Sequence, residues 1–316
     1  MDEKNIAIQI VDLEKKFNGF PALNGISFSV EKGDIVGYLG PNGAGKTTTI
    51  KILTNLLNPT RGQAYINGIN VNRHPKFALK PVGSLVEVPG VYEYFSPHDV
   101  LMYFGKVYKM DSKEIRPRIE EVLDLLKIGD WEYKRLGTFS TGMLRRFSIA
   151  KALLHYPEIL ILDEPVLGLD PKGMKHVREL IKRFQNEGMT IFLSSHLLGE
   201  VSETCDKVIF LDQGEVVDQD TVENVMQKIE SKIIKIKLLN PKIAETMDKI
   251  RTISFIEGVD STNDGILIVF DSTPETSSKI LKSLVSLGID LISFTPVSVS
   301  LEDFYLSVMG DEKGVN

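Results

Sequence analysis

The chain has 316 residues, of which 42% are hydrophobic and 25% charged, and its formal net charge is -6 at pH 7. This composition is typical of a globular protein, and the length suits about two domains. The net negative charge does not indicate the basic surface that nucleic-acid binding needs. No apolar run reaches the ~18 residues that cross a bilayer, the N-terminus has no signal-peptide pattern, and the single cysteine, Cys205, fits a reducing cytosol.

Strand-like segments dominate the start of the chain, and turn residues at Asn18-Gly19 and Lys32-Gly33 separate them. A glycine-rich turn, a helix and a further strand follow. In chain order, the predicted elements are strands Ile6–Val11, Ile26–Val30 and Ile35–Leu39, helix Lys46–Leu57 and strand Gln63–Asn67.

Residues from about 95 to 155 change to helical spacing, as in Ile119, Val122, Leu123 and Leu126. Buried strands return at Ile159–Leu162 and Thr190–Ser194. Between them a helix begins at Asp170-Pro171 and ends at Gly188. Strands that alternate with helices predict a largely parallel sheet covered on both faces, into which a helical subdomain is inserted.

After Asp220 the pattern restarts as a second domain with the order β-α-β-β-α-β. A short helix near Leu301–Met309 closes the chain. The other predicted elements are a strand around Ile234–Leu238, a helix from Pro241, strands Thr252–Ile256 and Ile266–Asp271, helix Pro274–Leu287 and strand Leu291–Thr295.

The segment from Gly40 to Thr47 matches the phosphate-binding pattern G-x-x-x-x-G-K-[ST], with a strand before it and a helix after it. Glycines let backbone amides touch phosphate oxygens, and the helix N-terminus adds its positive dipole end. Lys46 is expected to reach the β- and γ-phosphates, and Thr47 to bind Mg²⁺. The expected ATP contacts here are Gly40, Pro41, Asn42, Gly43, Ala44, Gly45, Lys46, Thr47 and Thr48.

Two carboxylates, Asp163 and Glu164, end the buried strand Ile159–Leu162. Such a strand end is often only solvated. Beside a phosphate-binding loop, however, Asp163 is expected to hold Mg²⁺ and Glu164 to orient the attacking water.

A further segment, Phe139-Ser140-Thr141-Gly142-Met143, resembles the signature motif of the ATP-binding cassette (ABC) family. Ser140 is positioned to cap the helix that follows. The resemblance covers roughly residues 5–220. It implies an α/β P-loop NTPase: a RecA-like core with an antiparallel β subdomain and a helical insertion over about 88–157. This domain is expected at 1–219, and a small α+β, ferredoxin-like domain at 220–316.

The resemblance also implies roles for single residues. Phe17 stands where an aromatic ring stacks on adenine, and Ser140 and Gly142 would contact the γ-phosphate held by a second subunit. His196, in Ser194-Ser195-His196, matches the switch histidine, and Leu169-Asp170-Pro171 matches the D-loop. The expected catalytic residues are Glu164, His196 and Lys46, and the expected metal ligands are Thr47, Asp163 and Glu87.

Three positions depart from the common family pattern: Thr141 replaces glycine, and Met143 and Glu87 replace glutamine. The Ser-x-Gly-Met form of the signature is similar to that of bacterial drug- and bacteriocin-immunity exporters. Glu87 keeps an oxygen ligand but adds a charge.

The resemblance implies a Mg-dependent ATPase that is a subunit of an exporter and powers transport through separate permease subunits. It also implies that this subunit pairs with a second cassette, either identical or different. An apolar notch around Tyr92 and Phe95 would receive the permease. The protein is expected in the cytoplasm, on the inner face of the membrane, with no bound nucleic acid. One alternative is a soluble ABC ATPase acting on nucleic acid or ribosomes, but only one phosphate loop and no long coiled coil is found.

Overall fold

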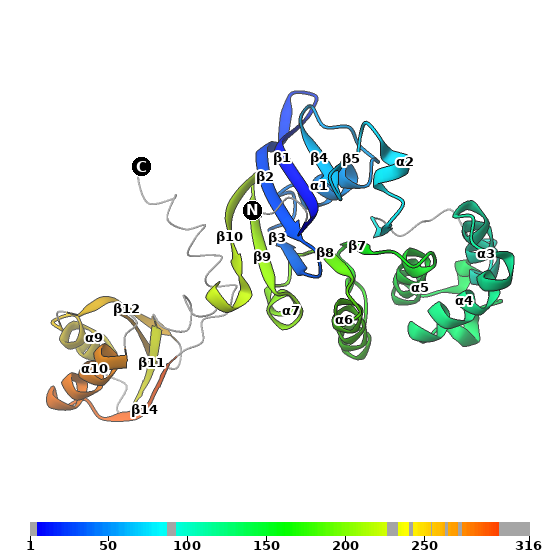
Figure 1. Cartoon of the computed structure of the whole chain (residues 1–316). Helices are drawn as coiled ribbons and strands as arrows, with labels where there is room; N and C mark the ends of the chain where they lie inside the picture. The colour runs from blue at the N-terminus through cyan, green and yellow to red at the C-terminus, as the bar shows by residue number, and fades with distance from the viewer. Residues whose placement is uncertain are drawn as a thin grey trace. The chain divides into compact units, whose positions relative to one another are not determined.

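The computed structural model describes residues 5–86, 93–225, 233–239, 243–253, 255–262, 265–270 and 274–296. The chain divides into two compact units, Met1–Asp220 and Thr221–Asn316 (Figure 1). Each unit is built around its own hydrophobic core.

The centre of unit 1 is a six-stranded sheet with the order β10-β9-β3-β8-β7-β6. Its inner strands β3, β7 and β8 are buried along their whole length, which explains their continuous apolar sequences. All pairings from β9 through β3, β8 and β7 to β6 are parallel, so these strands end at one edge. The strands are β3 (Ile35–Leu39), β6 (Val82–Leu85), β7 (Ile159–Asp163), β8 (Thr190–Ser195), β9 (Lys207–Asp212) and β10 (Glu215–Thr221).

Helix α1 (Lys46–Leu53) follows β3, while α6 (Pro171–Asn186) connects β7 to β8 and α7 (Leu198–Thr204) connects β8 to β9. Helix α6 begins as predicted, with the Asp170 side chain accepting a hydrogen bond from the amide of Gly173 and with proline at its first position. Helix α1 ends four residues before the predicted Leu57, because Asn55 adopts a left-handed conformation with φ of 55°.

A second, antiparallel sheet of unit 1 has the order β2-β1-β4-β5. Strands β1 (Ile6–Phe17) and β2 (Phe20–Glu31) are longer than predicted, because register shifts carry their pairing past the charged residues of β1. They meet at Asn18 and Gly19, whose positive φ angles of 48° and 87° suit a two-residue hairpin turn. The remaining strands are β4 (Arg61–Ile66) and β5 (Ile69–Asn70).

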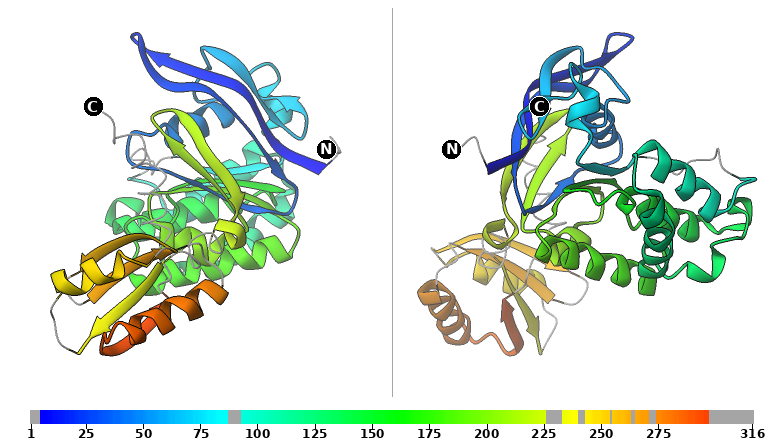
Figure 2. Two further views of the ribbon diagram at one scale, coloured as in Figure 1. Left: turned by 90° about the vertical axis from the view of Figure 1, so that its left-hand side faces the viewer. Right: turned by 45° about the vertical axis from the view of Figure 1, so that its right-hand side comes forward.

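The predicted helical insertion is present as α3 (Pro97–Val107), α4 (Ser112–Leu125) and α5 (Thr141–Leu153), which lie together beside the sheet (Figure 2). Helix α3 starts with a capping box, in which Ser96 and Asp99 satisfy each other's backbone amides. Short helical turns complete unit 1: α2 (Pro75–Ala78), η2 (Gly129–Trp131) and η3 (Leu136–Thr138).

Unit 2 has the element order that the sequence predicts, and its four strands form an antiparallel sheet with the order β12-β13-β11-β14. The predicted strand Thr252–Ile256 is wrong: Arg251 and Thr252 donate back to helix carbonyls, so the turn of α9 continues there and the strand begins at Ile256. The predicted helix Leu301–Met309 lies outside the described residues. The elements are β11 (Ile233–Leu238), α9 (Ile243–Ile250), β12 (Ile256–Thr262), β13 (Gly265–Phe270), α10 (Pro274–Ser286) and β14 (Leu291–Pro296).

Within the part of the chain that the structure describes, no helix combines the length and the apolar character needed to cross a bilayer.

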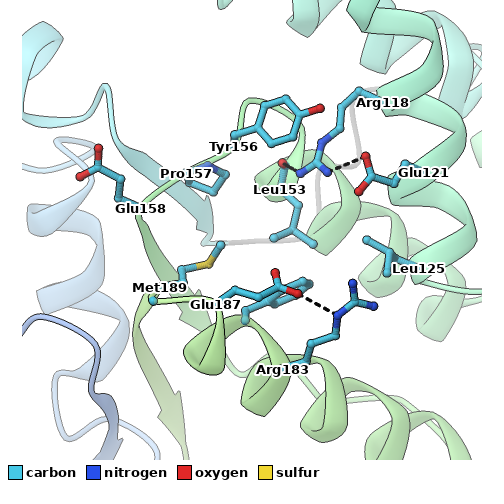
Figure 3. Close-up of a pocket in the computed structure, with 12 residues that line it drawn as sticks. Arg118, Glu121, Leu125, Leu153, Tyr156, Pro157, Glu158, Arg183, Glu187 and Met189 are labelled. Carbon is cyan, nitrogen blue, oxygen red and sulfur yellow. Dashed lines mark hydrogen bonds and ion pairs between the residues drawn. The ribbon is translucent and has the colours of Figure 1, made fainter.

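A cavity of about 350 Å³ lies where the helical insertion meets the end of α6 (Figure 3). Arg118 of α4 lines it and is only 7% exposed. Its guanidinium donates to the carbonyls of Leu153, at 2.6 Å, and Leu154, at 3.3 Å, at the C-terminal end of α5. The same group pairs with Glu121 at 2.9 Å and lies 3.9 Å from the ring centre of Tyr156. Arg118 therefore joins two helices by satisfying carbonyls that α5 leaves free.

We expect the substitution Arg118→Ala to lower the free energy of unfolding by about 3 kcal/mol, because it removes charged hydrogen bonds from two carbonyls and leaves that of Leu153 only a 3.3 Å bond from the amide of Tyr156. Urea denaturation monitored by circular dichroism measures this loss. Arg116→Ala, on the same helix but 67% exposed and paired with the exposed Glu120 at 3.6 Å, is the matched control and should change stability by less than about 0.5 kcal/mol. Equal effects of the two substitutions would contradict the capping role.

Candidate active site

The loop between β3 and α1 has no room for side chains at Gly40 and Gly45. A Cβ on Gly40 would lie 2.2 Å from the carbonyl oxygen of Leu211, and one on Gly45 would lie 2.7 Å from that of Ala22. Gly43 and Gly45 also have positive φ angles of 88° and 112°. Pro41, Asn42 and Thr48 are at least partly exposed, whereas Ala44 is buried. The loop and the α1 N-terminus therefore have the features of an anion cradle.

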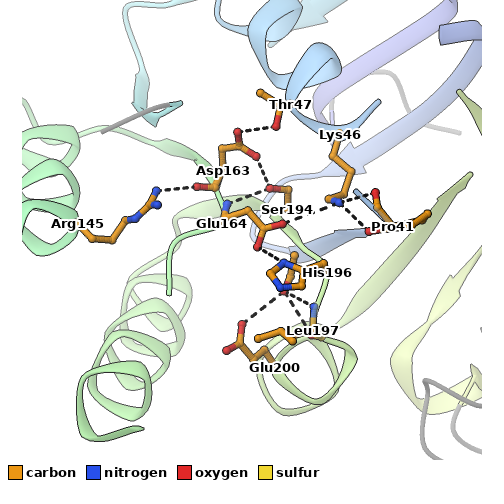
Figure 4. Close-up of polar contacts among 12 residues, drawn as sticks. Pro41, Lys46, Thr47, Arg145, Asp163, Glu164, Ser194, His196, Leu197 and Glu200 are labelled. Atoms are coloured by element: carbon orange, nitrogen blue, oxygen red, sulfur yellow. Dashed lines mark hydrogen bonds and ion pairs between the residues drawn. The ribbon is translucent and has the colours of Figure 1, made fainter. Parts of the chain in front are cut away.

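Lys46, the first residue of α1, is only 6% exposed. Its ammonium group donates to the carbonyls of Gly40 at 2.7 Å and Pro41 at 3.1 Å, and lies 3.9 Å from Glu164 Oε1 (Figure 4). Burial lowers the pKa of Lys46, and the charges of Glu164 and Asp163 oppose that shift. A buried ammonium group held by weak neutral acceptors is well suited to bind an anion in their place.

The carboxylate of Asp163, at the end of β7, is held from two sides. Thr47 Oγ1 donates to Oδ2 at 2.9 Å, and Ser194 Oγ donates to Oδ1 at 2.5 Å. Asp163 is 7% exposed and Ser194 is fully buried. The parallel register pairs Asp163 directly with Ser194 on β8, which explains why the two side chains meet.

Glu164 follows Asp163 with a φ of 50°, which is rare for a residue with a Cβ and costs on the order of 1–2 kcal/mol. Its amide donates to Ser194 Oγ at 3.0 Å, and this bond helps to hold the strained turn. Its Oε2 accepts a hydrogen bond from Nδ1 of His196 at 2.9 Å. The turn thus directs Glu164 towards both Lys46 and His196 (Figure 4).

Comparisons with known proteins agree with this geometry. Residues 23–167 match a family model described as ABC transporter. The chain is 36% identical to the bacitracin transport ATP-binding protein BcrA of Bacillus licheniformis, over 96% of this chain and 97% of the relative. It is 31% identical to the linearmycin resistance ATP-binding protein LnrL of Bacillus subtilis, over 96% and 98%. A solved ATP-binding subunit of an ABC transporter matches with a TM-score of 0.65 and 29% identity, over 70% of this chain and 92% of that one.

The chain belongs to the ABC transporter family. It is an ATP-binding subunit and an ATPase, and unit 1 has the P-loop fold of these cassettes.

Within this ABC subunit, five of the predicted site residues come together in one network. Lys46 and Thr47 come from α1, Asp163 and Glu164 from the end of β7, and His196 from the loop after β8. The structure brings these groups together from three segments that are far apart in the sequence.

The two signature residues make their contacts elsewhere. Ser140 caps α5, since its hydroxyl accepts a hydrogen bond from the amide of Met143 at 3.2 Å, and it is exposed. Gly142 packs against Gly168 and Leu169, where an added Cβ would lie 3.1 Å from the carbonyl oxygen of Gly168. Their role towards a second subunit's nucleotide stays a prediction.

Phe17, the predicted adenine contact, ends β1 and is 45% exposed, so its ring is accessible. Phe95, half of the predicted apolar notch, is 54% exposed. Glu87 and Tyr92 lie outside the described residues.

Sequence reasoning missed two groups that hold this site together. Ser194 stands directly before Ser195-His196, but its role depends on the register between β7 and β8, which a single sequence does not give. Arg145, on α5 and 8% exposed, donates to the backbone carbonyl of Asp163 at 3.3 Å. Burial lowers the pKa of Arg145, and the charges of Asp163 and Glu164 counteract this shift. No motif in the sequence marks this residue.

We expect Ser194→Ala to cost about 1–3 kcal/mol of stability, because it leaves the amide of Glu164 and an oxygen of Asp163 without their partner. We also expect the rate of ATP hydrolysis to fall at least about tenfold. The turn at Glu164 loses a hydrogen bond, and a free energy of about 1.4 kcal/mol corresponds to that factor. Urea denaturation and steady-state phosphate release measure the two effects. Ser286→Ala, at an exposed serine that bonds only within α10, is the control and should change neither. Unchanged hydrolysis in Ser194→Ala would contradict the bridging role.

Proposed function

We propose that this subunit drives export of an antibiotic-like compound through separate membrane permease subunits, hydrolysing Mg-ATP in a site that two cassettes complete together. The network of Lys46, Asp163, Glu164 and His196 carries the hydrolytic part of this proposal. Full-length similarity to proteins named for bacitracin transport and linearmycin resistance supports the export part.

The first step is capture of the triphosphate by the loop. Loop amides after Pro41 and the α1 N-terminus would face the phosphates, and Lys46 would exchange the carbonyls of Gly40 and Pro41 for phosphate oxygens. The 3.9 Å separation from Glu164 keeps the ammonium close to the carboxylate that acts next.

Thr47 and Asp163 fit Mg²⁺ because they supply a hydroxyl and a carboxylate oxygen, the hard ligands that this ion prefers. When bound, the ion would neutralise charge on the phosphates. The hydroxyl proton that Thr47 now donates to Asp163 would turn aside to leave both oxygens free as ligands.

Glu164 is the group that orients the attacking water. One of its oxygens lies near Lys46 and the other accepts from His196, so its carboxylate has a fixed direction. His196 is 32% exposed and uses only Nδ1 in this pair, which leaves Nε2 to contact the γ-phosphate. Because these groups are held before the reaction, catalysis comes mainly from positioning and charge stabilisation.

A second cassette would complete the site. Ser140 and the first amides of α5 are exposed at a helix N-terminus, which favours an anion there. In a face-to-face pair, each would contact the γ-phosphate bound by the other subunit, and phosphate release would weaken the interface. The pair can be two copies of this chain or two different cassettes.

The permease subunits are expected to contact the helical insertion near Phe95, on the inner face of the membrane. The names of the full-length relatives favour transport over the alternative of an ATPase that acts on ribosomes or nucleic acid. Mg²⁺ dependence, the pairing and the cargo class are all parts of this proposal.

We expect Glu164→Gln to keep ATP affinity within about threefold and to lower hydrolysis about 10²–10³-fold, because one pre-aligned polar group is lost. With ATP, this variant should elute as a dimer on gel filtration, since the closed pair cannot lose its γ-phosphates. Glu187→Gln, at an exposed glutamate paired with Arg183, serves as the control. Elution of Glu164→Gln as a monomer with ATP would contradict the composite site.

Export is tested in cells. Deletion of the gene should increase sensitivity to bacitracin or another membrane-active antibiotic, and the wild-type gene should restore resistance. Lys46→Ala should not restore it, because triphosphate binding is lost. Full complementation by Lys46→Ala would contradict ATP-driven export, and unchanged sensitivity to a panel of such antibiotics would contradict the cargo class.

A further inference from the structure

The tip of the β1–β2 hairpin carries two exposed aromatic rings. Phe17 and Phe20 are directly opposite each other across the turn, and they are 45% and 82% exposed. Side chains at directly opposed positions of an antiparallel pair project from the same face, with Cβ atoms about 4.5–5.5 Å apart. The two side chains therefore project from one face of the hairpin.

This face is the one turned towards the phosphate loop. Lys15 and Phe17 are two residues apart on β1 and so share a face, and Lys15 is opposite Leu23 on β2. Leu23 is fully buried, and its Cδ2 lies 2.7 Å from the place of a Cβ on Gly45. Leu23 and Phe20 are three residues apart on β2, but the register shift between Lys15 and Lys16 leaves one residue between them unpaired. Leu23 and Phe20 therefore project to the same side.

Lys15 covers one side of this arrangement. Its ammonium group lies 5.0 Å from the centre of the Phe17 ring and donates to the carbonyl of Asn58 at 2.8 Å, which holds it in place. A flat ligand that stacks on Phe17 must therefore use the ring surface that the ammonium leaves uncovered. Among the described residues, no ring contact joins Phe20 to another aromatic side chain, so its surface is free for a ligand.

We propose that Phe20 is a second base-binding residue, which extends the surface of Phe17 and gives this site its preference for purine over pyrimidine nucleotides. The proposal rests on the proposed function, because it requires the triphosphate to be held at Gly45 and Lys46. A purine has two fused rings and can contact both side chains, whereas a pyrimidine has one and gains less from the second ring.

The test is isothermal titration calorimetry on the full chain with ATP, CTP and inorganic tripolyphosphate. Phe20→Ala should raise the Kd for ATP about tenfold, the order expected from loss of one stacking side chain. The Kd for CTP should rise less than about threefold, since a single ring gains little from Phe20. The Kd for tripolyphosphate should not change. Phe20→Tyr should keep the wild-type affinity for ATP, because it keeps the ring.

Phe77→Ala is the matched control, since Phe77 is a 67% exposed phenylalanine on α2, and it should leave all three affinities unchanged. The proposal is overturned if Phe20→Ala binds ATP as wild type does, or if it weakens ATP, CTP and tripolyphosphate equally. The outcome for the proposed function is separate: that function fails if the wild-type chain itself does not bind ATP and tripolyphosphate, whatever Phe20 does.

Discussion

The parallel alignment of β7 with β8 is the constraint on which the site depends. It places Ser194 opposite Asp163, and one serine hydroxyl then donates to the carboxylate of Asp163 and accepts from the amide of Glu164. A fully buried hydroxyl with both partners satisfied fixes two neighbouring residues with different tasks. Asp163 accepts a hydrogen bond from Thr47, and Glu164 turns towards Lys46 and His196.

This arrangement also explains why an unfavourable backbone conformation persists at Glu164. A left-handed φ at a residue with a Cβ is tolerated only where surrounding contacts over-determine it. Here the preceding strand is completely buried, and the amide and both carboxylate oxygens of Glu164 have neighbours. Because of this strained conformation, the carboxylate of Glu164 points in a direction that it would not have if β7 continued as a regular strand.

Local patterns predicted most of the fold and four of the residues that meet in the candidate site, Lys46, Thr47, Asp163 and Glu164. The glycine spacing, the apolar run before Asp163 and the capped start of α6 are short-range signals, and each element formed near its expected place. Long-range effects explain the errors. Strand β1 extends through charged residues because it pairs with β2, and the predicted strand at Thr252 fails because α9 ends in a turn there. Ser194 and Arg145 acquire their roles only from neighbours 31 and 18 residues away.

Helix α5 connects several of these features. It begins at the exposed Ser140, holds the backbone of Asp163 through Arg145, and has its last carbonyls satisfied by Arg118 of α4. A ligand that binds at Ser140 and shifts this helix must change the free energy of the Arg145–Asp163 contact. Thermodynamic reciprocity then requires that occupancy near Asp163 changes the affinity at Ser140 by the same factor. Through the buried Arg145, a ligand near Asp163 and a ligand at Ser140 would thus influence each other within one protomer.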